Sequence, residues 1–260
     1  MITHPRTFAS SDFSARALCD AKGGRVVSVL VPARNEAPTI APVVDAIARS
    51  HLASAGGSGL VDQILVIDDG STDGTGELAE RAGARVLRRR GAGGKGQAMA
   101  AGLEESAGDL IVYLDGDVEN TTGDFVTGLL GPLLCDDAIT MVKAFYDRPL
   151  GESGTGGGRV TELMARPVLR TLFPDLAGII QPLAGETAAP RSVLEKVGFA
   201  DGYGVEIALL IDVATEFGAD TLAQVDLGVR RHRNRPLAEL GPQATEVLHA
   251  ALERAGMGRA

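Results

Sequence analysis

The sequence predicts an α/β protein with a mostly parallel sheet flanked by helices. Short apolar, β-branched runs alternate with segments of helical periodicity through the first half of the 260-residue chain. This alternation is typical of parallel strands joined by crossover helices. Polar or glycine-rich turns follow the apolar runs, and α/β proteins bind ligands at the carboxyl ends of parallel strands. One pattern therefore predicts both the fold class and the position of a ligand site.

Local sequence signals predict where elements of the first half begin and end. The run 26–31 is β-branched, and we expect it to end at Pro32, which lacks the N–H that a ladder needs. Pro42 suits the first turn of the following helix. The side chains of Ser71 and Asp73 suit the cap of another helix. The predicted strands are 26–31, 63–67, 85–87 and 110–114, and the predicted helices are 39–52, 76–82 and 96–105.

The second half departs from regular alternation. The stretch 151–158 is a glycine-rich loop suited to closing over a ligand, and Pro167 is expected to interrupt a helix. The predicted helices are 125–134, 159–172, 203–217 and 237–255, and the predicted strands are 140–145 and 223–229. No internal repeat or independent second domain is visible. We therefore divide the chain into an N-terminal arm, 1–24, and two halves of one domain, 25–118 and 119–260.

Composition and charge exclude several classes of protein. The hydrophobic content of 45% is ordinary for a globular protein, and the net charge of −9 argues against a general nucleic-acid binder. No secretory signal is visible, and no apolar run approaches the roughly 20 residues of a membrane-spanning helix. The two cysteines, Cys19 and Cys135, lack metal-site spacing. We expect a cytoplasmic protein in which any anionic ligand meets a local basic pocket.

Two aspartates directly after a predicted strand are the strongest functional signal. Asp115 and Asp117 follow the apolar run 110–114, and Gly116 between them permits a sharp turn. Both carboxylates are then expected at the carboxyl edge of the sheet. Paired carboxylate oxygens beside a cleft suit a hard divalent cation that is shared with phosphate oxygens.

Three further clusters fall where other elements end. The segment Pro32-Ala33-Arg34-Asn35-Glu36 suits either recognition of a base or sugar or a helix-capping turn. Asp68 and Asp69 open a turn in which capping explains Ser71 and Asp73 but does not require two adjacent acids. Lys95 lies in a glycine-rich turn at a predicted helix start, where it either meets a phosphate or acidic partner or is simply exposed.

A basic cluster, 230–236, follows the last predicted strand. It contains four arginines around His232 and Asn234. Such clusters are usually solvated, but a strand-end position in an acidic chain favours anion binding. Neutral imidazole is a common metal ligand, so His232 and Asp117 together are candidates for holding one divalent ion.

In their order along the chain, these clusters resemble the glucosyl-3-phosphoglycerate synthases, which are retaining glycosyltransferases with the Rossmann-like GT-A fold. The segments PARNE, DDGSTDGT and LDGD are shared by many GT-A enzymes. The second half is more specific, and its matching segments are VKAFYDRPL, GGGRVTELMARPVL, QPLAGETAAPR, GYGVEIALLID and LGVRRHRNRP. The likeness covers the chain from about Val26 to Arg254.

The resemblance implies roles at matching positions. It makes 25–118 a nucleotide-sugar-binding half and 119–260 an acceptor-binding half with a C-terminal elaboration. Asp117 and His232 would bind Mg²⁺ or Mn²⁺, and Asp115, Asp117, Glu206 and Lys95 would form the catalytic group. The implied donor-binding residues are Pro32, Ala33, Glu36, Asp68, Asp69, Lys95, Asp115 and Gly116. The implied acceptor-binding residues are Gly158, Arg159, Thr161, Tyr203, Asn234 and Arg230.

The implied reaction moves glucose from a nucleoside diphosphate sugar, with UDP-glucose favoured, to the 2-hydroxyl of 3-phosphoglycerate. A homodimer is also implied. Three alternatives stay open at this stage. They are transfer of mannose to the same acceptor, transfer of a sugar to a polyprenyl phosphate, and non-catalytic binding of nucleotide sugars.

Overall fold

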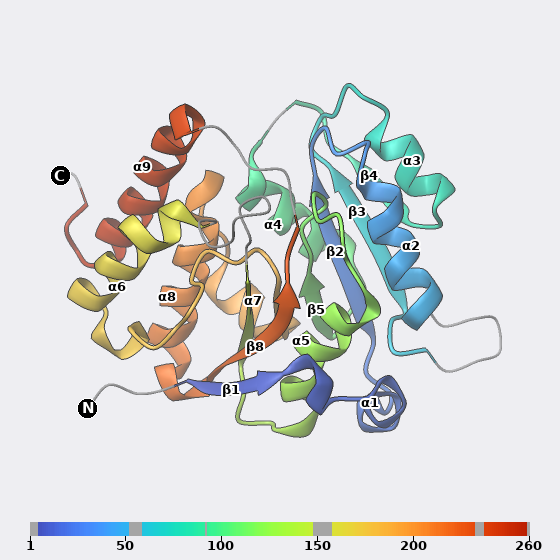
Figure 1. Cartoon of the computed structure of the whole chain (residues 1–260), viewed down its shortest axis with the longest axis horizontal. Coiled ribbons are helices and arrows are strands. Elements are labelled where there is room, and N and C mark those ends of the chain that lie inside the picture. Colours follow the sequence, from blue (N-terminus) through green and yellow to red (C-terminus); the bar gives the residue numbers. More distant parts are fainter. Residues whose placement is uncertain (1–4, 52–58, 92, 148–157, 232–236, 259–260) are drawn as a thin grey trace.

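The computed structural model describes residues 5–51, 59–91, 93–147, 158–231 and 237–258. Its centre is an eight-stranded sheet, which Figure 1 shows with helices on either side. The strands are β1 (Arg6–Ala9), β2 (Val27–Ala33), β3 (Gln63–Asp68), β4 (Arg85–Arg88), β5 (Leu110–Tyr113), β6 (Met141–Asp147), β7 (Thr187–Pro190) and β8 (Leu222–Val229).

The strand order is β1-β8-β6-β7-β5-β2-β3-β4. Only β7 runs against its neighbours, β5 and β6, and every other pair is parallel. The prediction of a mostly parallel sheet is therefore confirmed. Because β2, β3, β5, β6 and β8 all point the same way, their carboxyl ends share one edge of the sheet.

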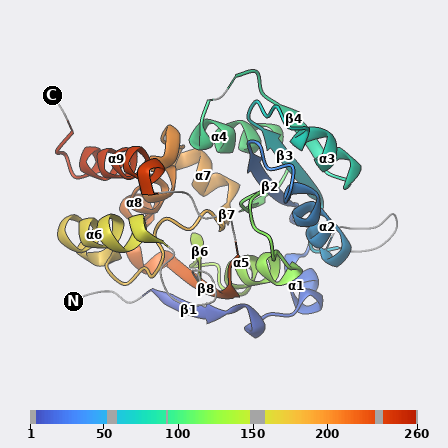
Figure 2. The same ribbon diagram turned by 45° about the horizontal axis from the view of Figure 1, so that its top comes forward.

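Helices cover both faces of this sheet (Figure 2). One core lies between the sheet and α1, α2, α3 and α5, and the second lies between the opposite face and α4, α6, α7, α8 and α9. The helices are α1 (Ala15–Lys22), α2 (Ile40–His51), α3 (Thr75–Arg81), α4 (Lys95–Glu105), α5 (Gly123–Cys135), α6 (Arg166–Leu172), α7 (Arg191–Val197), α8 (Val205–Phe217) and α9 (Leu237–Arg254).

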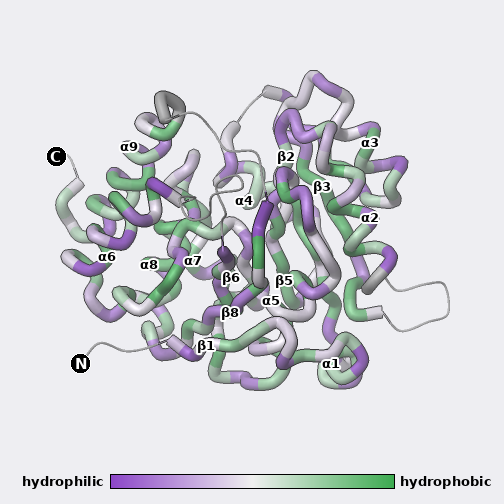
Figure 3. The backbone as a smooth tube through the Cα atoms, in the orientation of Figure 1, coloured by the Kyte–Doolittle hydropathy of each residue, from purple (hydrophilic) through white to green (hydrophobic). Residues whose placement is uncertain are grey.

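The strand β2 shows why two cores form. Successive side chains of a strand point to opposite faces, so Val29 and Val31 enter one core while Leu30 enters the other. All three side chains are fully buried. Apolar residues follow the inner strands in Figure 3, as expected for a sheet that is covered on both faces.

The expected end of β2 at Pro32 was wrong, since the strand continues to Ala33. Leu30 accepts from Leu114 N, so by alternation Pro32 also faces the β5 side, where strand pairing has already ended after Leu30. A missing N–H is therefore tolerated there. Pro167 marks a change of helix type within the predicted helix rather than a break in it. It stands at the start of α6, directly after a π-helical turn, Thr161–Ala165.

Several elements escaped prediction. β1 pairs with β8 and α1 packs on α5, so described residues of the predicted arm belong to the sheet and its core. β7 and α7 were also missed. β7 is four residues long and includes two alanines and a proline, none of which favours a strand. Among the described residues, no helix combines the length and the apolar character needed to cross a membrane.

Candidate active site

A pocket of about 540 Å³ opens at the carboxyl edge of the sheet. Its wall brings together most of the site residues predicted from the sequence. These are Pro32, Ala33, Glu36, Asp69, Lys95, Asp115, Gly116, Asp117, Gly158, Arg159, Thr161, Tyr203, Glu206 and Arg230. Asp68 does not line the pocket, and His232 and Asn234 lie outside the described residues.

Lys95 stands between two carboxylates at the first residue of α4. Its ammonium lies 2.6 Å from Asp115 Oδ1 and 2.6 Å from Glu206 Oε1. Burial alone lowers the pKa of this lysine, but the two acids outweigh burial and raise the pKa above its ordinary value. Lys95 is therefore a fixed positive charge on the pocket wall, and it orients both acids.

Asp69 holds the turn that carries Lys95. Its carboxylate accepts from Gly93 N at 3.2 Å and Gly94 N at 3.0 Å, and Arg89 Nη1 lies 2.5 Å away. Asp68 instead accepts from Ser71 N at 2.8 Å. The two adjacent acids therefore have different roles. Asp68 stabilises its own turn, and Asp69 holds the turn before Lys95 against the end of β3.

The start of α4 also depends on an absent side chain. A Cβ at Gly96 would collide with the backbone carbonyl of Ala200. We expect Gly96→Ala to displace Lys95 and to lower the free energy of unfolding by about 1–3 kcal/mol, the usual effect of overpacking. Gly241→Ala in α9 is the control, because a Cβ there meets open space. Urea denaturation checks both, and equal stability of the two variants would contradict this packing.

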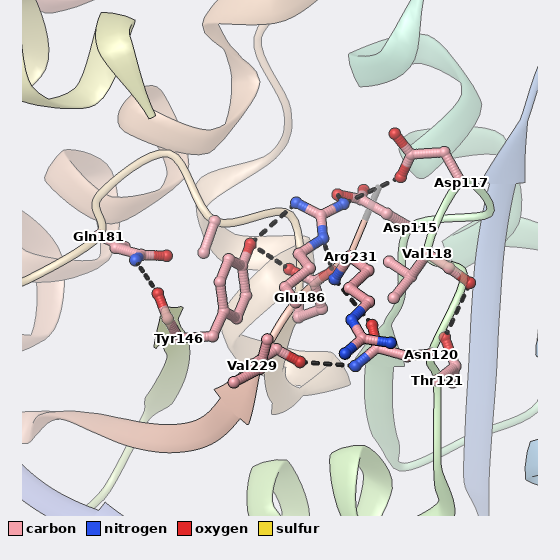
Figure 4. A network of polar contacts seen from close by, with 12 residues as sticks. Asp115, Asp117, Val118, Asn120, Thr121, Tyr146, Gln181, Glu186, Val229 and Arg231 are labelled. Atoms are coloured by element: carbon pink, nitrogen blue, oxygen red, sulfur yellow. Dashed lines mark hydrogen bonds and ion pairs between the residues drawn. The ribbon is translucent and has the colours of Figure 1, made fainter. Parts of the chain in front are cut away.

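Arg230 joins the Asp-Gly-Asp motif to the interior. Its Nη2 lies 2.8 Å from Asp115 Oδ2 and 2.9 Å from Asp117 Oδ1. Its Nη1 donates to the Tyr146 hydroxyl at 3.0 Å, and that hydroxyl donates to Glu186 at 2.8 Å. Its Nε lies 3.3 Å from Glu186. Figure 4 shows Asp115 and Asp117 on one side of this network and Tyr146 and Glu186 on the other.

The inner part of this network, Arg230, Tyr146 and Glu186, is almost sealed from water. Arg230 is 5% exposed and Glu186 is fully buried. Burial raises the pKa of Glu186, although Arg230 opposes that shift. Burial lowers the pKa of Arg230, but Glu186 and its other partners outweigh it and raise the pKa further above its ordinary value. In the sequence Glu186 is one of several acids near glycine-rich turns, and no pattern marks Tyr146.

Four of the predicted acceptor residues, Gly158, Arg159, Thr161 and Tyr203, line the same pocket. Gly158, Arg159 and Thr161 lie where the chain enters the helical stretch before α6. Tyr203 belongs to a 3₁₀ turn, Gly202–Gly204, and its N–H donates to Glu246 of α9 at 2.7 Å. Helix α9 therefore holds one of these four residues, which the sequence did not indicate.

The carboxylates of the pocket suit a divalent cation whose remaining ligands come from a bound substrate. The side chain of Asp117 is 32% exposed, so a carboxylate oxygen is accessible from the pocket. Within the described ranges, no group of three or more metal-ligating side chains forms a closed cage. Mg²⁺ in particular favours one or two carboxylates together with substrate phosphates.

Comparison with known proteins decides the family. The model of glycosyl transferase family 2 matches residues 28–175. A glucosyl-3-phosphoglycerate synthase from Mycolicibacterium paratuberculosis is 49% identical in an alignment of 251 residues that covers 91% of this chain and 74% of the relative. The chain belongs to the glucosyl-3-phosphoglycerate synthase family. A family member from Petrotoga mobilis is 45% identical over 88% of this chain and 73% of its own.

Solved structures of this family share the fold over nearly the whole chain. The glucosyl-3-phosphoglycerate synthase of Mycobacterium tuberculosis, in complex with Mn²⁺, UDP-glucose and phosphoglyceric acid, matches with a TM-score of 0.90 and 44% identity. The match covers 99% of this chain and 90% of that one. A complex of the same enzyme with Mn²⁺, UDP and glucosyl-3-phosphoglycerate gives a TM-score of 0.88 at 43% identity, over 98% and 89% of the two chains. The predicted GT-A fold is thereby confirmed.

Proposed function

We propose that this chain transfers glucose from UDP-glucose to the 2-hydroxyl of 3-phosphoglycerate with retention of configuration. The observation that supports this most is that a single pocket is lined by residues of both proposed sides. Lys95, Asp115, Asp117 and Glu206 belong to the donor side, and Arg159 belongs to the acceptor side. Membership of the glucosyl-3-phosphoglycerate synthase family supports the same reaction. The division into donor-binding and acceptor-binding halves, 25–118 and 119–260, belongs to this proposal.

On the donor side, Asp117 and His232 hold Mg²⁺ or Mn²⁺. When bound, the cation supplies Lewis-acid neutralisation of the charge that develops on the leaving diphosphate. Pro32, Ala33, Glu36 and Asp69 line the nucleoside end of the pocket. Asp115 and Glu206 offer carboxylate oxygens to sugar hydroxyls, and the Lys95 ammonium orients both carboxylates.

On the acceptor side, Arg159 and Arg230 supply positive charge to a compact polyanion. Guanidinium groups match carboxylate and phosphate oxygens in bidentate geometry. Gly158, Thr161, Tyr203 and Asn234 complete the proposed acceptor group. Since Asp115 and Glu206 are both engaged by Lys95, neither is a free nucleophile. We therefore favour a front-face route in which the acceptor hydroxyl attacks from the side that the leaving group vacates.

A matrix of donors and acceptors tests this function. UDP-glucose, GDP-glucose, UDP-mannose and GDP-mannose are each incubated with 3-phosphoglycerate or a polyprenyl phosphate, with Mg²⁺, Mn²⁺ or EDTA. We expect metal-dependent product only with 3-phosphoglycerate, and most of it from UDP-glucose. Product only from mannose donors, only on the lipid, or in no combination would replace the proposal with the corresponding alternative. A cytoplasmic homodimer, implied by the family resemblance, belongs to the proposal, and sedimentation velocity tests the dimer.

A further inference from the structure

A second lysine lies behind the pocket and has no part in the mechanism above. Lys143 of β6 is 1% exposed, and lysine is seldom buried unless it is paired. Its ammonium donates to the backbone carbonyl of Ala184 and to the Thr187 hydroxyl at 3.0 Å. Among the described residues, no carboxylate lies within ion-pair distance of it. A full charge is thus buried against two neutral acceptors, which is costly.

The Ala184 carbonyl that accepts from Lys143 belongs to the segment 183–186, and three other residues of this segment contact the site. Leu183 lines the pocket. Gly185 packs so closely on the Asp115 carboxylate that a Cβ would overlap it. Glu186 pairs with Arg230. The segment 183–186 therefore contacts the donor acid, the buried arginine and the pocket interior within four residues.

We infer that Lys143 is a positioning residue for glucose transfer: by fastening the Ala184 carbonyl, it sets the segment 183–186 against Asp115 and Arg230. The inference rests on the proposed function. The register of the sheet supports it, because Lys143 lies directly opposite Thr187 in the β6–β7 pair, at the point where this segment enters β7. An apolar residue at 143 would leave the Ala184 carbonyl without its donor.

The electrostatic surroundings give the role a measurable signature. Burial lowers the pKa of Lys143 to about 8. The charged groups that face it come from four directions: Glu206 on α8, Lys95 on α4, Glu186 before β7 and Asp115 after β5. As the pH rises through about 8, the ammonium loses a proton and its hold on the carbonyl weakens. We therefore expect the segment 183–186 to lose its position against Asp115 and Arg230 above about pH 8.

Stability should behave differently from activity. A lysine whose pKa is lower in the folded state than in the unfolded state opposes folding fully below about pH 8, and this cost is relieved as the pH rises toward the unfolded value. Lys143→Met removes that cost and also two hydrogen bonds, so the two effects oppose each other. We expect its melting temperature to stay close to that of the wild type.

Lys22 provides a matched control. It is also buried and donates to a backbone carbonyl, that of Gly59, but it pairs with Asp62 and does not line the pocket. Lys22→Met should lose stability through its unpaired partner and keep the wild-type kcat of the folded protein. Lys143→Met should show the reverse, with kcat lowered roughly a hundredfold, as expected for a displaced catalytic group, and with KM for both substrates changed less than about threefold.

The experiment measures kcat, KM and melting temperature for the wild type, Lys143→Met, Lys143→Arg and Lys22→Met from pH 6 to 9.5. The wild-type kcat should fall above pH 8. Lys143→Arg, whose guanidinium stays protonated, should retain part of the activity without that fall. Wild-type kcat in Lys143→Met, or a loss of kcat that only follows its loss of folded protein, overturns the inference. An inactive wild type overturns the proposed function and this inference together, whereas an active wild type matched by Lys143→Met overturns the inference alone.

Discussion

Asp117→Ala is expected to lower kcat/KM for metal-dependent transfer by about a hundredfold to a thousandfold, which is the range for removal of one electrostatic stabiliser. The physical reason is that Asp117 offers an accessible carboxylate oxygen at the pocket wall. Binding of Mn²⁺ in the presence of UDP, followed by electron paramagnetic resonance, should be lost as well. The fold should persist, because Arg230 retains Asp115 and Glu186 as partners.

Asp212→Ala is the matched control for the metal assignment. Asp212 is also a partly exposed aspartate in an ion pair with an arginine, Arg254, at 2.7 Å, but it lies on α8 outside the pocket wall. The Asp212→Ala variant should bind Mn²⁺ and turn over substrate like the wild type. Undiminished Mn²⁺ affinity in Asp117→Ala would remove Asp117 from the metal site. His232→Ala extends the same measurement to the second proposed ligand.

Arg230→Met is expected to lower the free energy of unfolding by about 3–5 kcal/mol, because it leaves a buried carboxylate without its cation. That carboxylate is Glu186, which is fully buried. The same variant should also lose most of kcat/KM for 3-phosphoglycerate. Urea denaturation and steady-state kinetics measure the two effects separately.

A double variant separates the structural from the functional part of this effect. Arg230→Met with Glu186→Gln removes both charges, so most of the stability should return while the activity stays low. Glu186→Gln alone is the third corner of the cycle. A double variant as unstable as Arg230→Met would show that the ion pair is not the source of the effect. Full recovery of activity would remove Arg230 from substrate binding.

The pH dependence of Arg230→Met follows from the same burial. Burial raises the pKa of Glu186, and without Arg230 nothing of equal size opposes the shift. A carboxyl whose pKa is higher in the folded state than in the unfolded state contributes stability that is present below the unfolded pKa and lost as the pH rises through the folded pKa. Arg230→Met should therefore recover stability under acidic conditions, and the double variant should not show this dependence.

Much of the site was predictable because the topology is encoded locally. The alternation of apolar runs with helical segments predicts parallel strands, and parallel strands bring their carboxyl ends to one edge. Asp69, Asp115 and Asp117 follow such strands, so their shared pocket follows from the pattern. Lys95 was placed near the donor by the family resemblance and not by this pattern, and in the structure it lies between Asp115 and Glu206.

The missed features depend on contacts between distant segments. β7 is too short and too rich in alanine to be predicted, yet it brings Thr187 opposite Lys143 and follows directly on Glu186. Glu246 reaches the Tyr203 N–H across 43 residues of sequence. No local pattern can specify such pairs, because the two partners lie far apart in the sequence and meet only when the helices and strands pack together.

The sequence by itself determined most strands of the sheet, the edge at which ligands bind and the aspartates that follow those strands, because strand periodicity and strand-end turns are local properties of the chain. Only the tertiary structure decided which charges meet. Asp115 is shared between Lys95 and Arg230, Glu186 is buried beneath Arg230, and Lys143 is sealed behind the pocket. Burial makes these pairings strong and raises or lowers their pKa values, and burial exists only when both faces of the sheet are covered.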